Sequence, residues 1–257
     1  MNKTCDIIKM VVNMSNEELN EQIQEIVDMI EVQQFAGTEE EIKIQQILYF
    51  DKYVKDNIDY GFEAANFLLQ HPNEKNPFDS AFRLEGFFQR NEINGKRLAV
   101  CGSISQAAKT ILNKLGIKCD YVWGHFNIGT NSEPQYLGHR WNVVTVGDKN
   151  YMVDFTIGMI IHNLNKDYNY ANAAKQLLAL NDESREYDYL FFDKLAPAQS
   201  IGGFKKNKNG TPVDDLDEFG IIKNSTTKPQ KVISNLGTIS QSNIIEYIKM
   251  FDRGRVL

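Results

Sequence analysis

Residues 138–154 read GHRWNVVTVGDKNYMVD, and this stretch predicts a β-hairpin. Two runs rich in Val, Trp and Tyr flank the dipeptide Gly147-Asp148. Such runs are typical of strands, and a glycine in the first position is typical of a two-residue type II′ turn. With that turn, Val146 pairs with Lys149, and the register of the whole hairpin follows.

The hairpin register predicts that a histidine and a carboxylate lie together. Counting outward from the turn places Trp141 opposite Asp154, and His139 shares the face of Trp141 because strand side chains alternate. His139 and Asp154 are then diagonal neighbours, about 7–8 Å apart between backbones, within reach of a hydrogen bond. A carboxylate between Val153 and Phe155 also needs a partner on a buried face, and this spacing supplies one.

The segment upstream of the hairpin predicts a helix from Cys101 to Leu115, ended by Gly116. Cys101 lies in its first turn, where unsatisfied amides and the positive end of the helix dipole favour a thiolate. A free cysteine is also a common buried apolar side chain, so Cys101 alone does not establish a reactive site. The predicted pair of His139 and Asp154 turns it into a candidate nucleophile.

These three residues have the functional groups of a catalytic triad. His139 would take the proton of Cys101, and Asp154 would fix the imidazole tautomer and stabilise its cation. The thiolate would then attack a carbonyl and form a thioester acyl-enzyme. The amide of Cys101 could donate to the developing oxyanion, and Gln89 and Asn94 have side chains of the right type for a second donor.

Several blocks of the sequence are similar to the transglutaminase-like superfamily, whose members share the papain-like fold of cysteine peptidases and acyltransferases. Residues 97–117 resemble its nucleophile helix with a Leu-Gly-Ile ending, and 138–142 resemble its Gly-His-x-Trp-Asn block. Residues 151–156 resemble its Asp block, and 47–60 its helix that ends in Ile-x-Tyr. The likeness extends over about residues 40–158.

The resemblance implies an α+β fold in which the nucleophile helix packs on an antiparallel β-sheet. It also implies the triad roles of Cys101, His139 and Asp154. Ala99 stands where family members often have glycine. Paired Cys-x-x-Cys zinc motifs are missing, which disfavours the peptide N-glycanase branch, and so is the Arg-Gly-Gly-x-Cys block of arylamine N-acetyltransferases.

The sequence predicts three regions: an N-terminal helical extension (1–37), a catalytic core (38–160), and a C-terminal extension packed on the core (161–257). Helical periodicity and capping residues predict helices. Those outside the nucleophile helix are 15–34, 38–57, 64–70, 78–90, 169–180 and 242–251. Strands are predicted at 119–128, 139–146, 149–156 and 187–192.

Composition excludes several classes of function. The chain has 257 residues and a net charge of −6, which disfavours nucleic-acid binding because phosphate recognition needs clustered Lys and Arg. No stretch is long and apolar enough for a membrane span. Three sparse cysteines predict free thiols rather than disulfides. Together with the lack of a clear leader they favour a cytoplasmic protein, and secretion stays open if a leader has been removed.

We expect no cofactor and no metal. The four histidines are scattered, and the acidic residues 214–218 lack the alternating pattern of a calcium loop. His125 could line a cleft, but an ordinary strand histidine is the simpler interpretation.

The first predicted function is hydrolysis of a peptide or amide bond in a peptide or protein substrate, as in small bacterial members of the superfamily. An amine acceptor would make the enzyme a transglutaminase, and water acting on a glutaminyl thioester would make it a deamidase. A binding module with a vestigial triad is the non-enzyme alternative. The sequence leaves the oligomeric state open.

Overall fold

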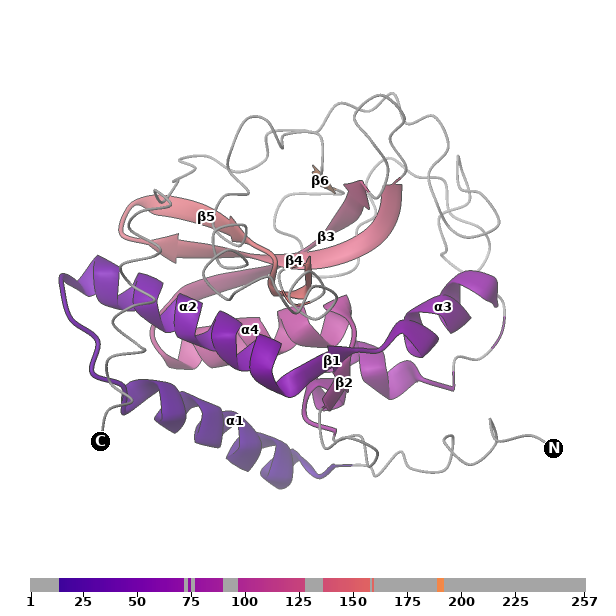
Figure 1. Ribbon diagram of the computed structural model, residues 1–257, viewed down its shortest axis with the longest axis horizontal. Coiled ribbons are helices and arrows are strands. Elements are labelled where there is room, and N and C mark those ends of the chain that lie inside the picture. Colours follow the sequence, from indigo (N-terminus) through magenta and orange to yellow (C-terminus); the bar gives the residue numbers. More distant parts are fainter. Residues whose placement is uncertain are drawn as a thin grey trace.

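Helices precede most strands along the chain, and together they form a mixed α+β structure (Figure 1). The computed structural model describes residues 14–71, 74, 77–89, 97–127, 136–157, 159 and 189–191. In chain order the elements are α1 (Asn16–Glu31), α2 (Glu39–Asn57), β1 (Ile58–Tyr60), α3 (Phe62–Gln70), the 3-10 helices η3 (Asp79–Phe82) and η4 (Leu84–Phe87), β2 (Arg97–Ala99), α4 (Cys101–Lys114), β3 (Lys118–Asn127), β4 (Tyr136–Val146), β5 (Lys149–Val153) and β6 (Tyr189–Phe191).

The first two helices begin where the sequence predicts them, at capping boxes. The Ser15 hydroxyl accepts the Glu18 amide, and the Glu18 carboxylate accepts the Ser15 amide. Thr38 and Glu41 make the same reciprocal pair at the start of α2. Each box satisfies two amides that have no partner inside the helix, so local sequence fixes both helix starts.

The larger sheet has four antiparallel strands in the order β5-β4-β3-β6. The predicted hairpin register is confirmed, since Val146 pairs with Lys149 and Asn142 with Val153. Gly147 has φ +60°, a conformation that a two-residue hairpin turn requires and that glycine adopts without strain. The helix that begins at Cys101, α4, packs on this sheet as predicted, since it contacts β3 and β4.

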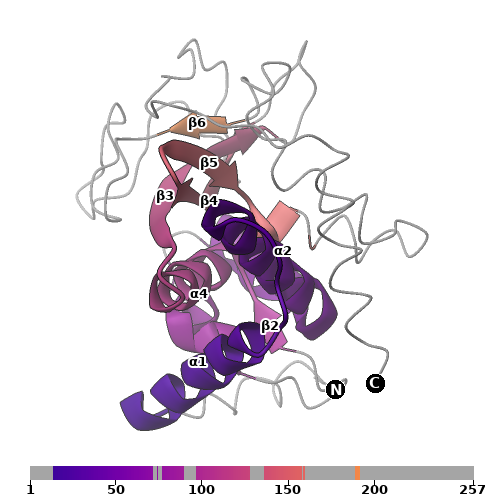
Figure 2. The same cartoon turned by 90° about the vertical axis from the view of Figure 1, so that its left-hand side faces the viewer.

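The helix α4 lies between this sheet and α1 (Figures 1 and 2). It contacts β3 and β4 on one side and α1 on the other, so it is buried along most of its length. Its aliphatic residues are fully buried and fall at helical spacing: Ile104, Ala107, Ala108, Ile111 and Leu112. Gly116, at φ +73°, follows its end as predicted.

A small parallel sheet of β1 and β2 joins the end of α2 to the start of α4. Ile58 lies opposite Arg97, and Tyr60 lies opposite Ala99. The amide of Gly61 extends the pairing by donating to the Ala99 carbonyl at 2.9 Å. Two segments that are far apart in sequence are thereby fixed side by side, just before the first residue of α4.

The helix predicted at residues 78–90 is wrong. This segment forms η3 and η4 instead, and the two turns fold back on each other. A Cβ at Gly86 would overlap the Ser80 carbonyl and the backbone of Ala81, so the close approach needs glycine. A glycine also weakens a helix interior, which favours the break.

Other predictions fall partly or wholly outside the described residues. The strand β6 lies within the predicted strand 187–192. The predicted helices 169–180 and 242–251 lie outside the described residues. The three-region division and the papain-like topology stay predictions. None of the helices that the structure describes combines the length and apolar character needed to cross a bilayer.

Candidate active site

Cys101 is the first residue of α4 and is partly exposed. The extended chain of β2 enters it through Val100, and Ser103 closes the first helical turn around that residue. The Ser103 hydroxyl accepts the Val100 amide at 3.1 Å and donates to the Val100 carbonyl at 3.0 Å. These bonds fix the backbone immediately before the nucleophile candidate, at the helix end where a thiolate is favoured.

Gly102 allows neighbouring groups to approach the start of α4 closely. A Cβ at this position would lie 2.7 Å from Nη1 of Arg140 and 3.0 Å from the Phe82 carbonyl oxygen. The Gln106 side chain donates to the same carbonyl at 3.0 Å. Any larger residue after Cys101 would therefore displace the Arg140 guanidinium or the η3 segment.

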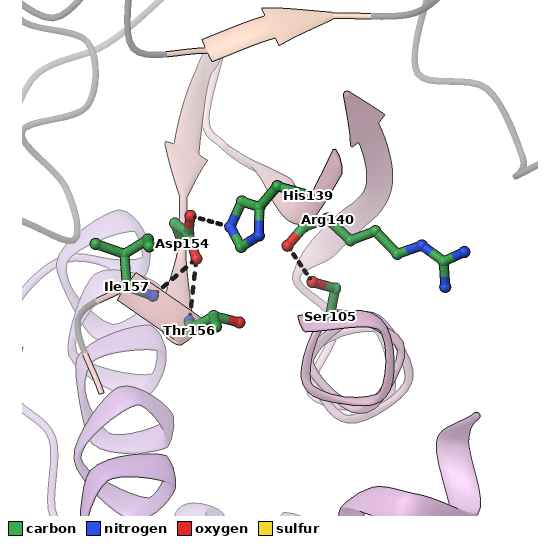
Figure 3. Close-up of polar contacts among 6 residues, drawn as sticks. All are labelled: Ser105, His139, Arg140, Asp154, Thr156 and Ile157. Atoms are coloured by element: carbon green, nitrogen blue, oxygen red, sulfur yellow. Dashed lines mark hydrogen bonds and ion pairs between the residues drawn. The ribbon is translucent and has the colours of Figure 1, made fainter. Parts of the chain in front are cut away.

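Two hydrogen bonds attach α4 to β4. The Ser105 hydroxyl donates to the Arg140 carbonyl at 3.0 Å (Figure 3), and the Asn142 side chain donates to the Ser105 carbonyl at 2.9 Å. Ser105 lies one helical turn after Cys101, and Arg140 directly follows His139. These bonds therefore hold the cysteine end of α4 beside the histidine of the strand.

The predicted hydrogen bond between His139 and Asp154 is present in the structure, with 2.6 Å between Nε2 and Oδ2 (Figure 3). The other carboxylate oxygen accepts the amides of Thr156 at 3.0 Å and Ile157 at 3.1 Å. These amides begin a helical turn, so β5 ends at Val153 rather than at Thr156 as predicted. The carboxylate is thus held in place by backbone donors while it orients the imidazole.

The His139 ring is 7% exposed and stacks on Trp141, with ring centroids 6.0 Å apart and planes 20° apart. Because Asp154 occupies Nε2, Nδ1 is the nitrogen that remains for Cys101. Burial alone would lower the pKa of His139. The charge and hydrogen bond of Asp154, with a smaller contribution from Cys101, raise that pKa above its ordinary value.

The thiol of Cys101 shifts in the opposite direction. Burial alone would raise its pKa, but hydrogen bonding with His139, the charge of His139 and the charge of Arg140 together lower that pKa. A lowered thiol pKa beside a raised imidazole pKa favours a proton on His139 and a negative charge on Cys101. The electrostatics of the site therefore favour a thiolate–imidazolium pair.

The structure places two further side chains at Cys101 that the sequence did not single out. Tyr60 lies in β1, which pairs with β2 just before Cys101, and burial together with the charge of Cys101 raises the pKa of Tyr60. The guanidinium of Arg140 packs over Gly102 and lies 5.7 Å from the centroid of the Tyr121 ring. The only sequence feature that indicated Tyr60 is the segment 47–60, of which Tyr60 is the last residue.

Other sequence candidates do not gain a role from the structure. Gln89 ends the described segment 77–89, where its amide bonds to the Glu85 carbonyl, and its oxyanion role stays a prediction. Asn94 lies outside the described residues. His125 is part of β3, and its place near a cleft stays a prediction. Within the described ranges no cluster of three His, Cys, Asp or Glu side chains could hold a metal ion.

Comparison with known proteins yields a distant structural likeness. No protein-family model and no curated protein matches the chain. A solved crystal structure of a TGase aligns with it at a TM-score of 0.44 and 20% identity. The alignment covers 58% of this chain and 35% of the TGase chain, so the likeness concerns about a third of that protein. The chemistry of the site follows from its own residues.

Proposed function

We propose that this protein is a cysteine-dependent acyl-transfer enzyme that hydrolyses peptide or amide bonds through a thioester intermediate. The observation that carries the proposal is the position of His139, which is bonded to Asp154 through Nε2 and lowers the pKa of the Cys101 thiol. A base held between an orienting carboxylate and a thiol of lowered pKa is the arrangement that nucleophilic thiol catalysis needs.

The first half-reaction uses all three side chains. The Cys101 thiolate attacks the substrate carbonyl carbon, and the carbonyl π electrons move to the oxygen. When the intermediate collapses, the C–N bond breaks, and the leaving amine takes the proton carried by His139. Asp154 stabilises the imidazolium until that transfer. The products are a free amine and a thioester on Cys101.

The second half-reaction regenerates the thiolate. His139, now neutral, takes a proton from water, and the hydroxide attacks the thioester carbonyl. The C–S bond breaks, the carboxylic acid leaves, and the thiolate–imidazolium pair forms again. An amine in place of water would give a new amide by the same steps, so the acceptor alone separates hydrolysis from crosslinking.

The decisive experiment measures the alkylation rate of Cys101 by iodoacetamide against pH, with the labelled site mapped by mass spectrometry. In the wild-type protein we expect rapid labelling well below the free-thiol pKa of about 8.5, because the pKa of Cys101 is lowered. In His139→Ala that labelling should slow sharply at the same pH. Labelling that begins only near the free-thiol pKa of about 8.5 and ignores His139 would contradict the proposal and favour a binding module.

A second experiment separates the acceptors. The protein is incubated with a mixture of unstructured peptides, with and without a primary amine such as cadaverine, and the products are identified by mass spectrometry. Hydrolysis predicts cleaved or deamidated peptides in both samples. Peptides that gain cadaverine, with few hydrolysed products, would show that an amine is the acceptor.

A further inference from the structure

We propose that the hydroxyl of Tyr60 is the second donor of the oxyanion hole, acting together with the backbone amide of Cys101. The proposal rests on the acyl-transfer function above and adds a catalytic residue to it. The first support is the small parallel sheet, which fixes Tyr60 relative to the nucleophile through the backbone.

The strand β1 places Tyr60 opposite Ala99, two residues before Cys101. The Gly61 amide then donates to the Ala99 carbonyl at 2.9 Å, and a Cβ at Gly61 would lie 3.4 Å from the Val100 side chain. Both strands therefore approach the start of α4 in close contact. Because strand pairing is rigid, the position of Tyr60 beside the helix start is built into the fold.

The side chain of Tyr60 is directed to the same point. Its ring packs against the hydrophobic core and meets the Phe62 ring edge to face, with centroids 4.9 Å apart and planes 70° apart. After burial, interactions with the side chain and the backbone of Cys101 are among the causes that shift the pKa of Tyr60, so its hydroxyl lies close to Cys101. Together with the strand pairing, this places the hydroxyl beside the first residue of α4.

This place is where charge develops during acyl transfer. When the sulfur attacks, the carbonyl carbon bonds to it, so the carbonyl oxygen becomes an anion two bonds from the sulfur. An O–H group that interacts with the thiolate at rest can donate to that oxygen as the charge moves from sulfur to oxygen. The Tyr60 proton stays on Tyr60 throughout, and the electrons return to the carbonyl when the intermediate collapses.

The protonation state of Tyr60 suits a donor. Burial is the largest cause that raises its pKa, and the negative charges of Cys101 and Asp154 raise that pKa further. Tyr60 therefore remains neutral at any pH at which the enzyme would act. A neutral hydroxyl donates to an oxyanion, whereas a tyrosinate would repel it.

Two reactions of Cys101 separate this role from a purely structural one. Alkylation by iodoacetamide is a displacement at a saturated carbon and forms no oxyanion, whereas acetylation by p-nitrophenyl acetate passes through one. In Tyr60→Phe we expect acetylation of Cys101 to slow by about 10²-fold. Loss of the interaction with the thiolate should shift the alkylation pH profile, so both rates are compared at a pH at which Cys101 is fully ionised. There the alkylation rate should change far less than the acetylation rate.

Tyr53→Phe is the matched control. Tyr53 is a buried tyrosine of α2, 8% exposed, and its hydroxyl accepts a hydrogen bond from Arg97. Its loss should lower the melting temperature without changing the ratio of acetylation to alkylation. An unchanged ratio in Tyr60→Phe, or a ratio that rises, would overturn the oxyanion role.

If Tyr60→Phe does not fold, the comparison moves to Tyr60→Gln and Tyr60→Leu. Glutamine keeps an N–H donor, so its ratio of acetylation to alkylation should exceed that of leucine, and equal ratios would overturn the proposal. Failure of the acyl-transfer function itself would look different from failure of the Tyr60 role. In that case Cys101 of the wild-type protein would show neither low-pH alkylation nor acetylation.

Discussion

Cys101 and Cys119 are the two described cysteines, and they differ in every property that decides reactivity. Cys101 begins α4 and is partly exposed, whereas Cys119 lies in β3 and is 1% exposed. Burial and the charge of Asp120 raise the pKa of Cys119. Burial would raise the pKa of Cys101 as well, but His139 and Arg140 together outweigh it and lower that pKa.

The contrast shows that the neighbours of a thiol, and not the residue type, decide its chemistry. Cys119 is held through its backbone, since Asn113 accepts its amide at 3.1 Å and donates to its carbonyl at 3.0 Å. Its side chain contributes to the hydrophobic core. The four predictions below test whether the two thiols separate in this way, beginning with the largest expected effect.

The largest effect should follow Cys101→Ala. Without the nucleophile, acyl transfer from p-nitrophenyl acetate should fall by about 10⁶-fold. Cys119→Ala is the control and should retain the wild-type rate. The measurement is the release of p-nitrophenol together with mapping of the acetylated residue, and acetylation of Cys119 at a comparable rate would break the distinction between the two cysteines.

The next effect should follow Asp154→Asn. Asparagine fills the same space but carries no charge to stabilise the imidazolium, so the acylation rate should fall by about 10⁴-fold. Asp148→Asn, which neutralises a carboxylate in the hairpin turn, is the matched control. A fall that is equal in both variants would show a general charge effect instead of a specific one at His139.

The ionisation of Cys101 itself should respond to His139→Ala. In the wild type the thiolate should form below the free-thiol pKa of about 8.5, because the thiol pKa is lowered and the imidazole pKa is raised. The pair is lost below the Cys101 pKa, where the thiol is protonated, and above the His139 pKa, where the ring loses its charge. In His139→Ala the thiolate midpoint should rise toward about 8.5.

The ultraviolet absorbance of the thiolate against pH measures this midpoint. The titration is run in a Cys5→Ala and Cys119→Ala background, so that neither of the other two cysteines adds a thiolate signal. A midpoint that stays near 8.5 with His139 present would show that the two groups do not couple in solution.

The smallest effect should follow Cys119→Ala. The substitution removes one buried sulfur from the core, so the free energy of unfolding should fall by about 1 kcal/mol. Denaturant unfolding followed by circular dichroism checks the value. The pH profile of Cys101 alkylation should not change, and a changed profile would mean that the two cysteines are linked through α4.

Local patterns allowed much of this fold to be predicted. The capping boxes at Ser15 and Thr38 involve residues three apart, and the turn at Gly147 requires a conformation that glycine readily adopts. The bond between His139 and Asp154 belongs to the same class, because both residues lie in one hairpin whose turn sets the register. Each of these interactions joins residues that are close together in the sequence, and for that reason each could be predicted.

The segment 78–90 shows where local patterns fail. Its composition permits a helix, but the contact between Gly86 and the Ser80 carbonyl folds it into two short turns. Likewise, β5 ends early because the Asp154 carboxylate takes the amides of Thr156 and Ile157. In both places a single contact outweighs propensity.

By itself, therefore, the sequence determined the α+β class, the hairpin, the helix that begins at Cys101, and the pairing of His139 with Asp154. Only the tertiary structure decided that the helix beginning at Cys101 lies beside the strand of His139, because bonds between Ser105 and β4 hold the two together. It also decided that Tyr60 lies beside the segment that leads into α4, through pairing of β1 with β2. Contacts between distant segments depend on packing that no local pattern encodes.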